Sequence, residues 1–284
     1  MIVDCHCHIF TERIVENVSA KPAMVDALKL NVHDALPRLD PKALDESAQA
    51  NGLDFCVLLP TASPGKVRSE NDRFINFTAR FQRIRTLATL HPAMGDMSGE
   101  VLRMFDFGIN GFKFSSFSQS FDLSSSETER MLSKLERLGA DRNTRPVLVF
   151  DTFALGDVYF EARPDHLTTP FRLAQIAGRH EGLNFVGAHM GGLLADFDEV
   201  RRELAPSPNI YLDTANAAHT FEEDQFVELL RMHGASHILF GTDWPWFVHS
   251  AEPAKILSLL EKAGYTESER ADVFGNNAER LFGL

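Results

Sequence analysis

Cysteine is scarce in this sequence, and long apolar runs are missing. Of the 284 residues only three are cysteines, Cys5, Cys7 and Cys56. Because the first two lie two residues apart on one expected strand, no disulfide framework is predicted, and a reducing cytoplasm is the expected location. No run of about 18 apolar residues occurs, so no membrane span is expected. A signal peptide is not expected either, because Ile2 already belongs to the first apolar strand.

Positive charge is also in short supply. Lysine and arginine total 28 against 40 aspartates and glutamates, which gives a formal net charge of −12. Nucleic acids are bound through clustered basic side chains, so this balance argues against a nucleic-acid partner. Hydrophobic residues make up 44% and charged residues 24%, values typical of a globular protein with a large core. The expected partner is a small-molecule substrate, and assembly into a homo-oligomer stays open.

What the sequence does have is a regular alternation of short apolar runs and amphipathic segments. The first run begins at Val3, and the later predicted strands are 55–59, 84–90, 109–114, 146–150, 184–188, 210–212 and 237–240. Helical spacing predicts helices over 42–51, 70–83, 98–106, 125–140, 169–180, 193–204, 221–233 and 251–263, with two short helices after them. Residues 9–40 carry no clean period and predict a long loop with one short helix at 24–30.

Eight strand–helix units within 284 residues predict one α/β domain over residues 1–284, a (β/α)8 TIM barrel with a long loop after the first strand. The later strands are continuous apolar runs, as expected of parallel strands that are covered on both faces. A doubly wound open sheet is the alternative. It is disfavoured because no glycine-rich phosphate loop follows the first strand.

The first strand ends in a His-x-His pair. Successive side chains on a strand alternate faces, so His6 and His8 are expected on one face and Cys5 and Cys7 on the other, toward the helices. Two imidazoles on one face can hold a cation between them. A zinc-type site needs three or four ligands, so the remaining ligands must come from later strands.

Ionisable side chains gather where the predicted strands end. These residues are His6, His8, His91, Lys113, Asp151, His189, Asp213 and Asp243. Since active sites of (β/α)8 barrels lie at the carboxyl ends of the strands, this convergence predicts a metal site. His189, which precedes a pair of glycines, and Asp243 are the strongest candidates. His91 and Asp213 fit the capping of loop backbone better than a direct role.

A second set of residues is expected to bind the substrate. A lysine at a barrel mouth must be paired or solvated, so Lys113 either grips a substrate carboxylate or balances Asp151. Arg163, in the loop after the fifth strand, is a further candidate for holding a carboxylate. Trp244 and Trp246 are candidates for the wall of a pocket for a flat ligand.

Several of these stretches resemble the amidohydrolase superfamily. The matching segments are His6-Cys7-His8, His189-Met190-Gly191-Gly192, Gly241-Thr242-Asp243-Trp244-Pro245 and, at the end of the chain, Gly275-Asn276-Asn277-Ala278-Glu279-Arg280-Leu281-Phe282. The last of these resembles the tail of the amidohydrolase-related branch. That branch includes 2-pyrone-4,6-dicarboxylate lactonase-like hydrolases and aminocarboxymuconate-semialdehyde decarboxylase-like enzymes.

The resemblance implies one divalent metal ion, with zinc the first choice and manganese the alternative. His6 and His8 are implied as ligands, Asp243 as a ligand and proton shuttle, and His189 as a residue for substrate contact or proton transfer. The family's usual fifth-strand histidine is replaced by Asp151. A carboxylate binds zinc at about the same distance as imidazole, so Asp151 is a predicted fourth ligand. Some lactonase-like relatives are thought to work without metal, and the substitution leaves that alternative open.

Three functional hypotheses follow. The first is a metal-dependent hydrolase of an ester, lactone or amide in a small, carboxylate-bearing molecule, with Asp243 and His189 as catalytic residues. The second is a metal-dependent, non-oxidative decarboxylase of an unsaturated or aromatic acid. The third is a ligand-binding barrel that lost its chemistry through the change at Asp151.

Overall fold

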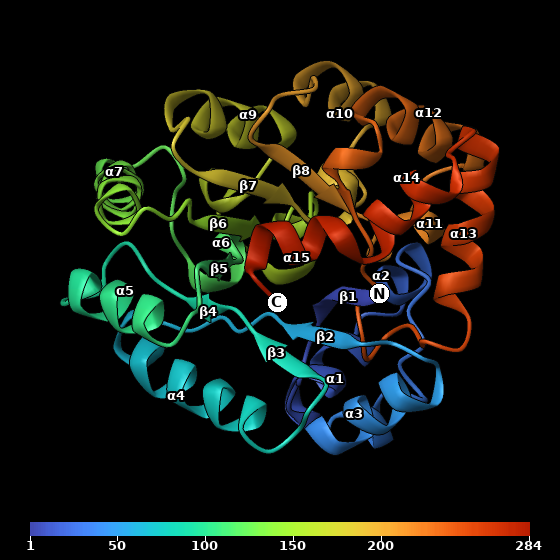
Figure 1. Cartoon of the computed structure of the whole chain (residues 1–284), viewed down its shortest axis with the longest axis horizontal. Helices are drawn as coiled ribbons and strands as arrows, with labels where there is room; N and C mark the ends of the chain where they lie inside the picture. The colour runs from blue at the N-terminus through green and yellow to red at the C-terminus, as the bar shows by residue number, and fades with distance from the viewer.

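Short apolar segments form a closed ring of parallel strands in the computed structural model, which describes residues 1–284 (Figure 1). The strands are β1 (Val3–Cys7), β2 (Phe55–Leu58), β3 (Ile84–Thr86), β4 (Ala88–Thr89), β5 (Gly111–Phe114), β6 (Val147–Phe150), β7 (Asn184–Gly187), β8 (Ile210–Asp213) and β9 (Ile238–Leu239). β3 and β4 are one extended segment interrupted at Leu87, so the ring has eight strands. The Cys5 amide closes it by donating to the Phe240 carbonyl at 2.9 Å. The predicted (β/α)8 barrel is confirmed.

The barrel interior is apolar below the strand ends. Alternate side chains from the strands fill it, together with the last helix, α15 (Asn277–Phe282), and the interior cluster comprises Val3, Cys5, Val57, Leu59, Leu87, Val147, Val149, Val186, Leu239, Ala278, Leu281 and Phe282. Figure 1 shows α15 lying across one end of the barrel. The ionisable side chains predicted for the site lie at the opposite end, where the strands finish.

Helices cover the outside of the barrel, near the predicted positions. The main ones are α3 (Pro41–Ala50), α4 (Val67–Thr78), α5 (Met97–Asp106), α7 (Ser126–Asp141), α9 (Pro170–Arg179), α10 (Phe197–Glu203), α12 (Glu223–His233) and α13 (Glu252–Ala263), and α14 (Glu267–Ala271) precedes α15. Several begin at a side chain that accepts a backbone N–H, such as Asp40 and Asp96. Such caps contribute about 1 kcal/mol each. No helix combines the length and the apolar content that a membrane span needs.

The segment after β1 is more ordered than the predicted loop. It holds two helices, α1 (Glu12–Ser19) and α2 (Pro22–Ala27), so the prediction of a single short helix at 24–30 was wrong. Val15, Val18 and Met24 are buried against aromatic side chains from the loops after β6 and β9. These two short helices thus cover the carboxyl ends of the strands. Smaller helical turns, α6 (Ser116–Gln119), α8 (Gly156–Phe160) and α11 (Ala217–Thr220), follow β5, β6 and β8.

The predicted side-chain alternation along β1 is interrupted. The pairing of β1 with β2 shifts register between Asp4 and Cys7. Cys5 consequently packs in the barrel interior, whereas Cys7 packs in the outer layer beside Leu44. The prediction that both thiols face the helices was wrong for Cys5, because an irregularity of this kind reverses the parity of the residues before it.

Candidate active site and metal centre

Three ligand atoms converge where β1 and β9 end. The Nε2 atoms of His6 and His8 are 3.0 Å apart, and Asp243 Oδ1 lies 3.7 Å from the first and 3.5 Å from the second. Four-coordinate zinc with bonds of about 2.0–2.1 Å separates its ligand atoms by about 3.3 Å. The donor set and the spacing of this metal trio therefore fit a divalent ion, with one or more positions left for water or substrate.

The second nitrogen of His6 is fixed by a carboxylate. His6 Nδ1 donates to Asp213 Oδ2 at 2.9 Å, and Asp213 Oδ1 accepts the backbone amides of His189 and Ala215 at 2.8 and 3.2 Å. The proton on Nδ1 leaves the Nε2 lone pair free for a metal. Sequence reasoning assigned Asp213 to loop amides alone. Its contact with His6 was not predicted, because neither the His6–His8 pair nor the residues around Asp213 indicate that the end of β8 lies beside β1.

Burial sets the protonation of the trio. It lowers the pKa of His6 and His8 well below the usual histidine value, and the Lys113 ammonium lowers both further. Both imidazoles are therefore neutral and available as ligands. Burial and the Asp151 carboxylate raise the pKa of Asp243 well above its ordinary range. A bound cation reverses that effect on a carboxylate, because its charge favours the ionised form.

His189 presents one nitrogen to the same space. Its Nδ1 donates to the Ala215 carbonyl at 2.8 Å, and its ring lies 4.7 Å from that of His6 between centroids. The side chain is buried, and the backbone adopts a left-handed φ of 55°. Because Nδ1 donates to this carbonyl, Nε2 is the nitrogen that is left for contact with a ligand.

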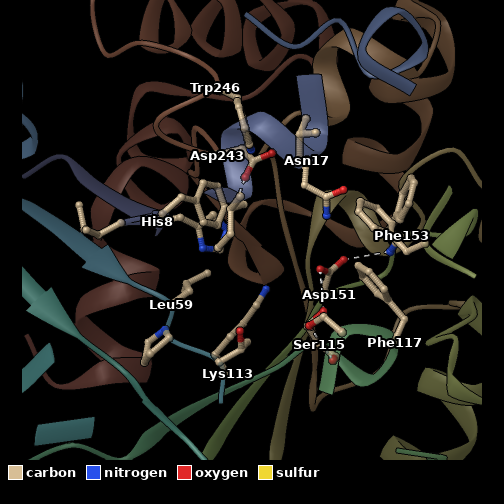
Figure 2. Close-up of a pocket in the computed structure, with 18 of the residues that line it drawn as sticks. His8, Asn17, Leu59, Lys113, Ser115, Phe117, Asp151, Phe153, Asp243 and Trp246 are labelled. Atoms are coloured by element: carbon tan, nitrogen blue, oxygen red, sulfur yellow. Dashed lines mark hydrogen bonds and ion pairs between the residues drawn. The ribbon is translucent and has the colours of Figure 1, made fainter. Parts of the chain in front are cut away.

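Lys113 and Asp151 lie across the cavity from the trio. Lys113 is 2% exposed, and its Nζ has no hydrogen-bond partner. Figure 2 shows its amine pointing into the cavity between His8 and Asp151. Burial lowers the pKa of Lys113, and the Asp151, Asp213 and Asp243 charges oppose this. An unpaired buried ammonium in a cavity is suited to an anionic ligand.

Asp151 is held by protein donors and stands apart from the trio. Its Oδ2 accepts from Ser115 Oγ at 3.1 Å, and its Oδ1 accepts from the Phe153 amide at 3.0 Å (Figure 2). It is absent from the groups of side chains whose ligand atoms lie within 4.8 Å of one another, among them His6 with His8 and Asp243. Its position beside Lys113 fits charge balance better than metal ligation.

The cavity above these groups has a volume of about 770 Å³. Its floor is polar and its walls combine aliphatic and aromatic side chains, with Phe10, Phe117, Phe153, Phe160 and Trp246 among the lining residues. Asn17 from α1 points into it from the covering helices (Figure 2). The site is thus a deep pocket sized for a small molecule, with charged groups at one end and flat apolar surfaces around the rest.

The barrel and its strand-end site match one family. The family model described as amidohydrolase, of the second group, matches residues 3–284. The chain belongs to this amidohydrolase family. The resemblance of its motifs is confirmed, and the chain is an enzyme of the amidohydrolase superfamily, whose members bind a divalent metal. Comparison with curated proteins gives no match.

Solved structures share the amidohydrolase barrel at low sequence identity. A 5-carboxyvanillate decarboxylase from Novosphingobium aromaticivorans, complexed with manganese and 4-hydroxy-3-methoxy-5-nitrobenzoic acid, is 14% identical with a TM-score of 0.69, covering 100% of this chain and 96% of its own. A 2,6-dihydroxybenzoate decarboxylase from Rhizobium is 17% identical with a TM-score of 0.66 and coverage of 100% and 98%. A probable 2-pyrone-4,6-dicarboxylic acid hydrolase from Acinetobacter baumannii is 12% identical with a TM-score of 0.63 and coverage of 100% and 99%.

Two predicted substrate contacts lie outside the cavity of this amidohydrolase. Trp244 is buried in the barrel wall, where its Nε1 donates to the Arg38 carbonyl at 3.1 Å and its ring stacks on His249. Arg163 is exposed and pairs with Asp165. Neither lines the cavity, so these assignments are corrected. Both residues lie in loops, where the alternation of side chains along a strand no longer predicts which way a side chain points.

Asn216 is one of the polar cavity residues that the sequence did not single out. Asn216 is 1% exposed, lines the cavity, and its side-chain oxygen and nitrogen have no hydrogen-bond partner. It adopts φ 54°, a conformation that asparagine tolerates better than most residues. His91, by contrast, bonds loop backbone, the Gln119 carbonyl through Nε2 and the Ala93 amide through Nδ1, as the sequence analysis expected. Asn216 therefore adds an amide donor and acceptor to the site.

Proposed function

We propose that this amidohydrolase acts on a small carboxylate-bearing molecule held between a divalent metal and Lys113. The observation that carries the proposal is the unpaired, buried Nζ of Lys113 in the same cavity as the trio of His6, His8 and Asp243. Burying an unpaired ammonium costs several kcal/mol, and an anionic substrate offsets that cost. The other end of the substrate then lies against the aromatic walls.

The favoured reaction is hydrolysis of an ester, lactone or amide. A divalent ion at the trio supplies Lewis acidity and promotes ionisation of water. Asp243 accepts the proton of the attacking water at a carboxylate oxygen. His189 Nε2 relays that proton from Asp243 to the leaving group, so the proton taken from water ends on the leaving group and Asp243 regains its starting state. Lys113 fixes the substrate carboxylate, and the helices α1 and α2 limit the entry of bulk water.

The metal we propose is zinc, with manganese as the alternative. Two imidazoles and one carboxylate form a donor set that both ions accept, because imidazole suits zinc and carboxylate suits manganese. One of the similar solved structures contains manganese. Elemental analysis of the purified protein decides between the two ions.

The second candidate is non-oxidative decarboxylation of an unsaturated or aromatic acid. The aromatic walls of Phe10, Phe117, Phe153, Phe160 and Trp246 favour it, because they suit a flat ring. Similar solved structures include two kinds of benzoate decarboxylase. In this reaction the same trio orients the carboxylate, and an acid group delivers a proton to carbon in place of carbon dioxide.

One experiment separates these reactions and tests the site. The metal-loaded enzyme is incubated with a panel of lactones and with a panel of hydroxybenzoates, and ring opening and carbon dioxide release are measured in parallel. We expect lactone opening that falls at least about 100-fold in Asp243→Asn, the range associated with loss of a general base. Lys113→Met is expected to raise KM much more than it lowers kcat. Carbon dioxide release without lactone opening would establish the second candidate, and no turnover with either panel would favour a ligand-binding barrel.

We further propose that the enzyme works in the reducing cytoplasm. All three cysteines, Cys5, Cys7 and Cys56, are free and buried. Free thiols in this number are typical of proteins from that compartment.

A further inference from the structure

A second group of ligand-type side chains lies in the barrel wall, outside the cavity. Asp4 and Cys7 come from β1, Cys56 from β2 and His249 from the segment after β9. Their exposures are 0%, 0%, 0% and 2%. One ligand atom from each lies within 4.8 Å of the others, and none of the four lines the substrate cavity. We call these residues the wall cluster.

The distances within the wall cluster fit a tetrahedral ion. His249 Nε2 lies 3.0 Å from Asp4 Oδ2 and 3.9 Å from Cys56 Sγ. Zinc bonds of about 2.0 Å to oxygen and nitrogen and about 2.3 Å to sulfur separate ligand atoms by about 3.3 to 3.8 Å. The nitrogen–sulfur distance is the longer of the two, as those bond lengths require. A set of two thiolates, one imidazole and one carboxylate is also chemically suited to zinc.

Neighbouring groups already orient the ligands. His249 Nδ1 is 3.0 Å from Ser47 Oγ, which leaves Nε2 directed at the cluster. Asp4 Oδ1 accepts the backbone amides of His6 and Thr242, both at 3.0 Å, and Oδ2 accepts from the Thr242 hydroxyl while facing His249. Supporting hydrogen bonds of this kind are typical of metal sites.

Apart from Ser47 and Thr242, the side chains around the wall cluster are mainly apolar. Cys7 and Cys56 pack with Leu44, Leu58 and Trp244. A carboxylate and an imidazole in such a layer are expensive to bury, and well-packed apolar residues in their place usually cost nothing. The Asp4–His249 pair is satisfied by protein hydrogen bonds, and the two thiols beside it complete a set of four ligand-type side chains.

We propose that Asp4, Cys7, Cys56 and His249 form a second metal site, for zinc or a similar thiophilic divalent ion. Binding forms bonds to both sulfurs, Nε2 and one carboxylate oxygen. The thiol protons of Cys7 and Cys56 and the Nε2 proton of His249 leave to solvent, and no oxidation or reduction takes place. The ion joins β1, β2 and the segment after β9, directly behind His6 and Asp243, and its role is structural.

Cobalt replaces zinc in such sites and reports on sulfur ligands. The full-length protein is produced in cells supplied with Co²⁺ and purified under reducing conditions, because a fully buried site exchanges metal slowly. Only the wall cluster supplies thiolates, since the trio in the cavity consists of two histidines and one aspartate. We expect thiolate-to-cobalt charge-transfer absorption and one equivalent of metal beyond that of the trio.

Matched variants assign the signal. The absorption should persist in Asp243→Asn, which damages only the cavity site. It should also persist in Cys5→Ser, a control that removes a buried thiol two residues from Cys7 but outside the cluster. It should disappear in Cys56→Ser. If the wild-type protein lacks the charge-transfer band, the proposal is overturned whatever the variants show. The group is then an Asp4–His249 ion pair that binds no metal. Turnover decides the proposed function separately.

Discussion

The Asp213 carboxylate supports the site although it does not line the cavity. It bonds His6 Nδ1 through one oxygen and two backbone amides through the other. The amides come from the loops after β7 and β8, so one side chain aligns His6 with the segment that carries His189. The protonation of His6 is thereby decided by a residue that does not touch the metal position.

Asp213→Asn is expected to weaken metal binding about 10- to 100-fold, the range known for partners of metal-bound histidines. The asparagine oxygen keeps the two backbone amides, so its NH₂ group faces His6 Nδ1. His6 then carries its proton on Nε2, the atom required as ligand. Competition with a chelator of known affinity measures the effect. Asp165→Asn makes the same change of charge at the surface and serves as the control. Equal metal affinity in both variants would show that the His6 tautomer is not set by Asp213.

The end of β9 is pressed closely against β1. A Cβ added to Gly241 would lie 2.8 Å from His6 Cβ and 3.3 Å from Ala215 Cβ, whereas real Cβ contacts are longer. The Asp243 amide also donates to the His6 carbonyl at 2.9 Å. The spacing of the trio therefore depends on a residue without a side chain at this contact.

Gly241→Ala is expected to separate the two strand ends, to lower metal affinity at least about 10-fold, and to destabilise the fold by about 1–3 kcal/mol, as overpacked cores do. Metal titration and denaturant unfolding measure the two effects. Gly178→Ala is the control, because nothing lies within 4 Å of its added Cβ on α9. Unchanged metal affinity in Gly241→Ala would show that the strand ends tolerate the displacement.

The sequence predicts the positions of helices and strands well, and the directions of their side chains less well. Apolar runs and helical spacing located the barrel strands and outer helices, because each of these elements buries one face or both. They did not reveal the reversed parity at Cys5, since a register shift leaves composition unchanged. They also did not distinguish Trp244 from Trp246 as the cavity wall, because the turn after β9 determines which indole faces inward. α1 was missed because eight residues give too few turns for a clear period.

For the molecule as a whole, His233 is one of the buried histidines that link stability to pH. His233, at the end of α12, is 5% exposed, and neither ring nitrogen has a partner. Burial, helped by the nearby His237, lowers its pKa to about 4 from 6.5. The folded protein keeps this ring neutral while the unfolded chain protonates it below pH 6.5. The buried, neutral His233 therefore imposes no cost on the fold above pH 6.5. As the pH falls toward 4, protonation of this residue in the unfolded chain lowers the free energy of unfolding.

The His233→Leu variant should lack the part of the acid-induced loss of stability that His233 causes. Between pH 7 and pH 4 the shift corresponds to about 3 kcal/mol of unfolding free energy, with part of it lost by pH 5. Denaturant unfolding at pH 7 and pH 5 is compared for the wild type and the variant. His33→Leu, at an exposed histidine, is the control and should retain the wild-type dependence. If His233→Leu loses as much unfolding free energy between pH 7 and pH 5 as the wild type does, other titratable groups cause the loss.

The closure of the barrel between β1 and β9 has a consequence for synthesis. Asp4 and Thr242, which join the two ends of the ring, are 238 residues apart in the sequence. A ribosome releases His6 and His8 long before it makes Asp243, so the nascent chain carries two histidines without their carboxylate for most of translation. Metal capture at the trio is thus coupled to completion of the chain, and truncated products that lack β9 are left without the centre.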